Sequence, residues 1–192
     1  MKKSIGINSM VFPSPVFVVG TYDEDEKPDM ITIAWAGIAA SDPAAVVIAV
    51  RPTRYSHENI IKHKAFTVNL PTKKFIKEAD YFGITSGRDT DKLADTGLTA
   101  VKGEFVDAPY IEEFPFAIEC ELADQLDFGS HTLFIGAIKD IKVDTEIIGE
   151  NDKVDFVKAG ILTFDISTDS YLLPGEFAGK AFSEGLFFRK KE

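Results

Sequence analysis

The sequence of 192 residues has little cysteine and little basic charge, and each shortage excludes a class of protein. Cys120 is the only cysteine, so the chain can form no internal disulfide and no zinc or iron–sulfur site built from several cysteines. The 21 basic and 31 acidic residues leave a formal net charge of -10, which would repel a phosphate backbone. We therefore expect no nucleic acid partner, and a reducing, cytoplasmic compartment is the simplest setting.

Long apolar runs and common cofactor motifs are also missing. No stretch approaches the roughly 20 apolar residues that a membrane-spanning helix needs. Lys2 and Lys3 could begin a signal peptide, but Asn8, Pro13 and Pro15 interrupt the apolar run that follows them. The pattern predicts a soluble protein with no membrane partner. There is no H-x-E or H-E-x-x-H arrangement to indicate a metal site, and no G-x-G-x-x-G motif to mark a separate dinucleotide-binding module.

The residues that are abundant favour β-structure. Sixteen phenylalanines and many valines and isoleucines suit half-buried, pleated surfaces. Short strands at frequent intervals, with a few helices between them, predict one mostly β domain with inserted helices (α+β) over residues 1–192, arranged as a β-barrel. The predicted strands are 16–22, 30–38, 44–50, 65–70, 116–124, 131–143 and 160–165; the predicted helices are 57–64 and 72–82, and 84–97 is a loop with at most one helical turn.

A basic, hydroxyl-rich segment precedes the first predicted helix. Arg51, Thr53, Arg54 and Ser56 set two guanidinium groups and two hydroxyls at the presumed helix start, with Ser56 as its N-cap. A helix start offers free N–H groups and partial positive charge, and arginine adds charge-assisted hydrogen bonds to a phosphate. The segment therefore indicates an anion site, although the same arginines could simply pair with nearby carboxylates.

A strand of small residues around Trp35 leads toward that segment. A flat aromatic ligand needs backbone polar groups for its edge and apolar surface for its face, and Trp35 could supply the surface. A lone tryptophan is also a common core residue, so this alternative stays open.

Several motifs in sequence order resemble one known family. Lys27-Pro28-Asp29-Met30-Ile31-Thr32, Ser41-Asp42-Pro43, Arg51-Pro52-Thr53-Arg54-Tyr55-Ser56 and Phe66-Thr67-Val68-Asn69-Leu70-Pro71 are similar to the flavin reductase-like, FMN-binding split-barrel family, which includes flavoredoxin-like proteins. The resemblance implies a split β-barrel that binds FMN, with the flavin ring and ribityl chain along the strand at Thr32 and the phosphate on the arginines. The implied cofactor-binding residues are Thr32, Ile33, Ala34, Trp35, Ala36, Arg51, Thr53, Arg54, Tyr55, Ser56, Asn69 and Leu70.

The resemblance also suggests a catalytic residue, partners and an activity. Lys92 matches a family lysine that approaches and tunes the flavin, although it could be a solvated loop lysine. Family members are usually homodimers with FMN near the subunit interface, and the loop around Lys92 could reach across that interface. The leading expectation is an NAD(P)H-dependent flavin reductase-like oxidoreductase. The alternatives are a flavoredoxin-like electron carrier that needs a redox protein as partner, and a non-redox binding protein. Leu172-Leu173-Pro174-Gly175-Glu176 departs from the family pattern and leaves a nicotinamide-facing role there open.

The remaining candidates favour structural roles. His131 could reach the cofactor region, but a bond to a turn carbonyl is favoured. His57 and His63 are expected on a surface helix, and Cys120 is expected to be a buried small hydrophobe.

Overall fold

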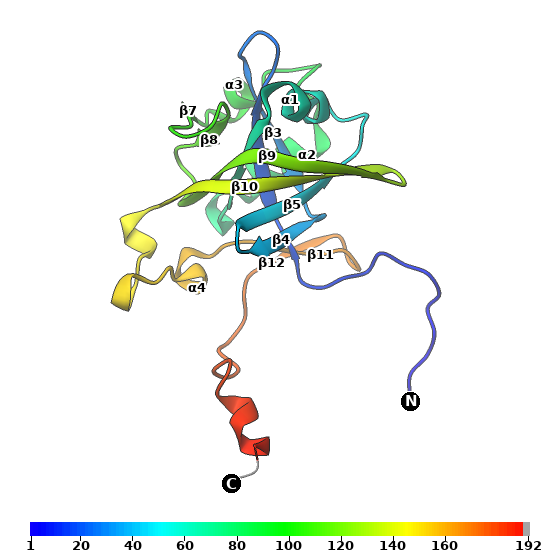
Figure 1. Ribbon diagram of the computed structural model, residues 1–192, viewed down its shortest axis with the longest axis vertical. Helices are drawn as coiled ribbons and strands as arrows, with labels where there is room; N and C mark the ends of the chain where they lie inside the picture. Colours follow the sequence, from blue (N-terminus) through cyan, green and yellow to red (C-terminus); the bar gives the residue numbers. More distant parts are fainter. Residues whose placement is uncertain (190–192) are drawn as a thin grey trace.

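The computed structural model describes residues 1–189 and is built around one antiparallel sheet (Figure 1). Seven strands follow the order β3-β2-β6-β9-β10-β5-β4. This confirms the predicted mostly β class with inserted helices. The strands of this sheet are β2 (Phe17–Tyr22), β3 (Pro28–Ile33), β4 (Ala36–Ser41), β5 (Ala44–Val50), β6 (Ala65–Asn69), β9 (Phe116–Phe128) and β10 (His131–Val143).

Smaller elements surround the sheet. β1 (Ser14–Pro15), β11 (Thr163–Asp165) and β12 (Ser170–Leu172) form a three-stranded sheet, and β7 (Ala100–Lys102) pairs with β8 (Pro109–Ile111). The α-helices are α1 (Tyr55–His63), α2 (Ile76–Ile84), α3 (Lys92–Thr96) and α4 (Phe156–Ala159). Short 3-10 helices cover Lys73–Phe75, Thr145–Ile147, Glu150–Asp152 and Glu184–Phe188.

The sheet curls, and β3, at one end of the strand order, approaches β5 near the other end. At the junction of β3 and β4, the backbone N–H of Ala49 in β5 donates to the carbonyl of Trp35 at 2.8 Å. Ile31 and Ile33 of β3 share one buried cluster with Ile48 of β5 and Phe134 of β10. A barrel-like interior therefore forms between strands that are far apart in the strand order.

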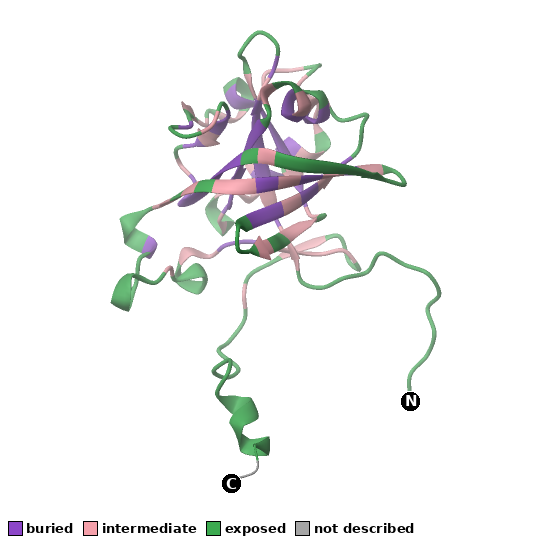
Figure 2. Ribbon diagram, viewed as in Figure 1, coloured by how far each residue is buried: buried purple, intermediate pink, exposed green. Residues whose placement is uncertain are grey.

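β2 and β3 are buried on both faces. Val19 and Ile31 point into the barrel interior, whereas Val18 and Met30 pack with Phe82 of α2 in a second buried cluster. Alternating side chains therefore join the barrel to the helices that cover it. Figure 2 shows these strands in the buried colour, while the N-terminal segment and the chain after β12 are exposed.

Two predictions about this region are wrong in detail. The predicted strand 30–38 is two strands, because the chain bends at Ala34 and Trp35, where the N–H of Ala36 donates to the carbonyl of Ala34 at 3.1 Å. The predicted helix 72–82 has different bounds: α2 begins at Ile76 and continues through Gly83 to Ile84, with Thr85 as its C-cap. Gly83 packs closely on Thr32, since an added Cβ would lie 3.4 Å from the Thr32 Cβ.

The other elements match the predictions more closely. β5 and β10 have the predicted bounds, and residues 84–97 hold one short helix, α3. Cys120 is fully buried in the barrel core, and burial raises the pKa of its thiol to about 12. Among the described residues, no helix is long and apolar enough to cross a membrane.

Candidate functional site

A pocket of about 490 Å³ opens where the chain bends between β3 and β4. Residues of β3, β5, α2 and the β11–β12 hairpin contribute to its lining. It is lined by Val16, Ile31, Thr32, Ile33, Ala34, Trp35, Ala49, Val50, Arg51, Arg54, Asp80, Gly83, Ile84, His131, Phe164, Asp169 and Tyr171. Six of the predicted cofactor-binding residues therefore line one pocket: Thr32, Ile33, Ala34, Trp35, Arg51 and Arg54.

The basic end of the pocket lies at the start of α1. Arg54 is the N-cap of this helix, and Arg51 and Arg54 both reach the pocket with exposed side chains. The first N–H groups of a helix have no acceptor within the helix, so they are free to bind an anion. Two arginines and a helix start together make this end suited to a phosphate group.

Ser56 does not cap the helix, and this part of the prediction is wrong. It lies inside α1, is 1% exposed, and its hydroxyl donates to Asp29 Oδ2 at 2.8 Å. Its neighbour Tyr55 donates its hydroxyl to Asp23 Oδ2 at 2.8 Å. Burial and this hydrogen bond raise the pKa of Tyr55 to about 12, so the phenol stays protonated at neutral pH.

The aromatic end of the pocket is formed by residues from separate strands. Trp35 is 46% exposed, and its ring stacks on His131 of β10, with ring centroids 6.3 Å apart and planes 17° apart. Burial and the charge of Arg51 lower the pKa of His131, which favours the neutral imidazole. These rings provide flat apolar surface beside the backbone of the bend, where a planar heteroaromatic ring can be read by main-chain groups.

His131 is a residue for which the favoured sequence interpretation was incomplete. Its Nδ1 forms a hydrogen bond with the hydroxyl of Ser130 at 2.9 Å, and its ring lines the pocket. In the sequence, only the turn before β10 marked His131. The fold connects it with the pocket, because its ring stacks on Trp35.

The far side of the pocket was missed altogether. Phe164 and Tyr171 pack together in the β11–β12 hairpin with centroids 5.8 Å apart, and the Tyr171 hydroxyl donates to Asp80 Oδ1 of α2 at 2.9 Å. Asp169 and Ile84 complete this side. No local pattern marks these residues, because tertiary packing alone brings them to the site.

The structure places the other predicted residues outside the pocket wall. Asn69 is fully buried: its side-chain amide donates to the Val18 carbonyl and to Thr67, and its oxygen accepts from the Ile111 N–H at 3.0 Å. Leu70 is also in the core. Ala36, Thr53, Tyr55, Ser56, Asn69, Leu70 and Lys92 do not line the pocket.

Lys92 forms a buried ion pair and is not a solvated loop residue. Its ammonium group lies 2.9 Å from Asp29 Oδ1 and also donates to the carbonyl of Met30. Both charged side chains are 4% exposed. Lys92 therefore contacts the strand beneath the anion end, and its predicted contact with a flavin stays a prediction.

The histidines of α1 also have structural partners. His57 Nε2 lies 2.9 Å from Thr132 Oγ1, and His63 bridges Asp107 and the carbonyl of Asp23. Within residues 1–189, no group of three or more histidine, cysteine or acidic side chains is arranged to hold a metal ion.

A curled antiparallel sheet with this pocket defines a split-barrel protein of the flavin reductase type. Residues 9–160 match the flavin reductase like domain family, and the chain therefore belongs to it. The chain is 43% identical to flavoredoxin of Desulfovibrio vulgaris (Miyazaki F), with a TM-score of 0.92 over 96% of this chain and 100% of that one.

Two more distant structures have the same fold. Flavoredoxin from Methanosarcina acetivorans is 27% identical, with a TM-score of 0.87 over 96% of this chain and 98% of that one. A Shewanella frigidimarina protein with a split barrel domain is 19% identical, with a TM-score of 0.82 over 92% of this chain and 89% of that one. The last likeness supports the fold alone.

Proposed function

We propose that this protein binds FMN in the pocket and carries electrons as a flavoredoxin-like protein. The observation that carries the proposal is the composition of one pocket, whose lining includes Arg51 and Arg54 together with the stacked rings of Trp35 and His131. A ligand with a phosphate and a flat aromatic ring would match both the arginines and the stacked rings. A pocket of about 490 Å³ is also within the usual range for a cofactor site.

The residues present suit FMN. The guanidinium groups of Arg51 and Arg54 would hold the phosphate, helped by the start of α1. Trp35 and the small residues of the bend would hold the ring, while Phe164 and Tyr171 would limit access of water to it. When bound, FMN supplies a group that accepts and releases one or two electrons. The protein binds, orients and shields it.

The likeness to flavoredoxin favours the carrier over the flavin reductase that we expected first. At 43% identity over the whole of the other chain, the resemblance extends beyond a shared fold. An electron carrier would need a redox protein as donor and acceptor. A reductase would instead oxidise NADH or NADPH directly.

One anaerobic experiment tests these functions. The purified protein is loaded with FMN, and its visible spectrum is recorded before and after NADH or NADPH is added. The carrier is expected to bind flavin that is bleached by dithionite and hardly changed by the nicotinamides. Rapid bleaching by NADH or NADPH would support the reductase, and a protein that binds no FMN would exclude both redox functions.

We also propose that the protein is a homodimer. The segment after β12 exposes Phe177, Phe182, Phe187 and Phe188, and β4 exposes Ile38 at the sheet edge. Exposed apolar surface of this extent is typical of an interaction surface. Light scattering during size-exclusion chromatography should give twice the chain mass, and a monomer at micromolar concentration would contradict the proposal.

A further inference from the structure

The loop between α2 and α3 contacts the anion end of the pocket through Arg88. Arg88 Nη1 donates to the carbonyl of Thr53 at 3.1 Å, and its guanidinium carbon lies 5.1 Å from the centre of the Tyr55 ring. Three of the four arginines in the sequence, Arg51, Arg54 and Arg88, are therefore gathered at one turn. Arg88 does not line the pocket itself. It holds the backbone between the two arginines that do.

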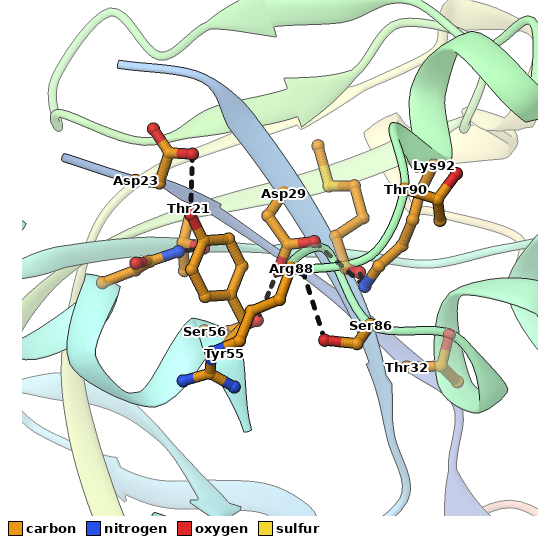
Figure 3. Close-up of polar contacts among 12 residues, drawn as sticks. Thr21, Asp23, Asp29, Thr32, Tyr55, Ser56, Ser86, Arg88, Thr90 and Lys92 are labelled. Carbon is orange, nitrogen blue, oxygen red and sulfur yellow. Dashed lines mark hydrogen bonds and ion pairs between the residues drawn. The ribbon is translucent and has the colours of Figure 1, made fainter. Parts of the chain in front are cut away.

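A second contact reaches the same turn from beneath. Lys92, the first residue of α3, pairs with Asp29 of β3, and Asp29 accepts a hydrogen bond from Ser56 in the first turn of α1 (Figure 3). All three side chains are buried. This network connects the end of the loop, through one carboxylate, to the start of the helix.

Gly87 allows the loop to lie close against Asp29 and Tyr55. A Cβ added to Gly87 would lie 2.3 Å from Asp29 Oδ1 and 2.9 Å from Tyr55 Cδ1. These are closer than side-chain carbons approach other atoms, so a larger residue at this position would push the loop away. The contacts of Gly87, Arg88 and Lys92 are thus independent signs that residues 85–92 are fitted onto the turn.

We infer that residues 85–92 act as a clamp that holds the Arg51–Ser56 turn ready for the phosphate and so selects phosphorylated over unphosphorylated flavin. In this account Arg88 and Lys92 are positioning residues that act through Thr53 and Ser56. Holding the turn in its binding conformation reduces the ordering cost that ligand binding would otherwise carry. The inference rests on the proposed FMN site and adds what determines its ligand preference.

The test compares FMN with riboflavin, which has the same ring and lacks the phosphate. In Arg88→Ala, we expect the Kd for FMN to rise about tenfold, as for loss of a well-placed supporting contact, while the Kd for riboflavin stays unchanged. Arg88→Gln keeps a donor for the Thr53 carbonyl and should recover most of the FMN affinity. Arg189→Ala removes the fourth arginine, outside the pocket and the clamp, and serves as the matched control.

Three results would overturn the inference. FMN affinity could be unchanged in Arg88→Ala; the two flavins could weaken equally, which would assign Arg88 to the ring; or Arg88→Gln could bind as weakly as Arg88→Ala, which would indicate direct charge attraction.

Hydrogen exchange tests the clamp without any flavin. The N–H groups of Arg54 and His57 donate to the carbonyls of Arg51 and Arg54 at 2.9 and 3.1 Å. Arg88→Ala and Gly87→Ala should speed the exchange of these two amides in the ligand-free protein, whereas Gly185→Ala, where an added Cβ meets open space, should not. Unchanged exchange in both loop variants would overturn the clamp. A protein that binds neither flavin would disprove the proposed function and the flavin preference that rests on it, and the exchange result would still show whether residues 85–92 hold the turn.

Discussion

The two ends of the pocket are built in different ways. The anion end comes from one continuous segment, Arg51–Ser56, and is held by one buried and one exposed hydrogen bond and by a buried ion pair. The aromatic end is assembled from the β3–β4 bend, β10, α2 and the β11–β12 hairpin, and Trp35 is half exposed. A substitution near the anion end should therefore disturb a connected network, while one at the aromatic end should remove a single contact.

The largest expected effect is on stability when the buried ion pair is broken. Lys92→Met leaves Asp29 charged and buried without its partner, and the free energy of unfolding should fall by about 3–5 kcal/mol. Asp29→Asn with Lys92→Met should recover much of this loss, because no lone buried charge remains. Urea unfolding measures both variants.

The matched control for that experiment is another lysine–aspartate pair. Lys27 and Asp91 lie 3.2 Å apart with side chains 47% and 45% exposed, so Lys27→Met should cost less than about 1 kcal/mol. An equal loss of unfolding free energy in Lys27→Met and Lys92→Met would show that burial of the Lys92–Asp29 pair has no energetic consequence.

The next largest effect concerns the pocket arginines. In Arg51→Ala/Arg54→Ala, loss of two charge-assisted hydrogen bonds should raise the Kd for FMN about 100-fold or more and leave riboflavin binding unchanged. Fluorescence titration of each flavin measures this. The control Lys2→Ala/Lys3→Ala removes the same charge from the exposed N-terminal segment. Undiminished FMN affinity would refute phosphate binding at this end.

The aromatic end should respond differently. Trp35→Ala removes the stacked ring, and the Kd values for FMN and riboflavin should rise together, each by about tenfold. Phe105→Ala truncates an exposed aromatic outside the pocket and should change neither value. If Trp35→Ala weakened FMN alone, the division of the pocket into two ends would be wrong.

The smallest effect is a dependence of stability on pH. Burial lowers the pKa of His57 below its usual 6.5, so below that pH the unfolded chain binds more protons than the folded one. Stability should be level above about pH 6.5 and should fall as the pH drops from there toward the folded-state pKa. Urea unfolding between about pH 7.5 and 5.5 measures the slope.

Two variants compare a buried histidine of α1 with a histidine of the pocket in the same experiment. His57 of α1 is buried and His131 beside Trp35 is only partly buried, although its pKa is also lowered by burial and by Arg51. His57→Gln should therefore reduce the slope more than His131→Gln. The reverse order would show that the pKa of His131 is lowered more than that of His57.

The sequence predicted what is local and missed what is assembled by tertiary packing. β10 was predicted with its observed bounds, because apolar residues and a preceding glycine turn mark it clearly. Arg51 and Arg54 were found because they lie together before a helix. Phe164 and Tyr171 were missed, because the β11–β12 hairpin is far in the sequence from the other pocket residues and only the folded chain brings it beside them.

Errors in the predicted site have the same origin. Ser56 has the residue type of an N-cap, but its hydroxyl is bound to Asp29, which lies far away in the sequence. Asn69 lies in a conspicuous motif, yet its hydrogen bonds hold β2 and β8 together. Residue type indicated polarity correctly in both cases, but the partner could be known only from the fold.

The pair formed by Asp29 and Lys92 also constrains how this chain can diverge. A lineage that replaced either residue first would pass through a protein with one lone buried charge, at a cost comparable to a large part of a domain's stability. Neutral drift at either position should therefore be slow, and the two residues should be inherited or lost together. Among descendants of this chain, a change at position 29 should predict a change at position 92.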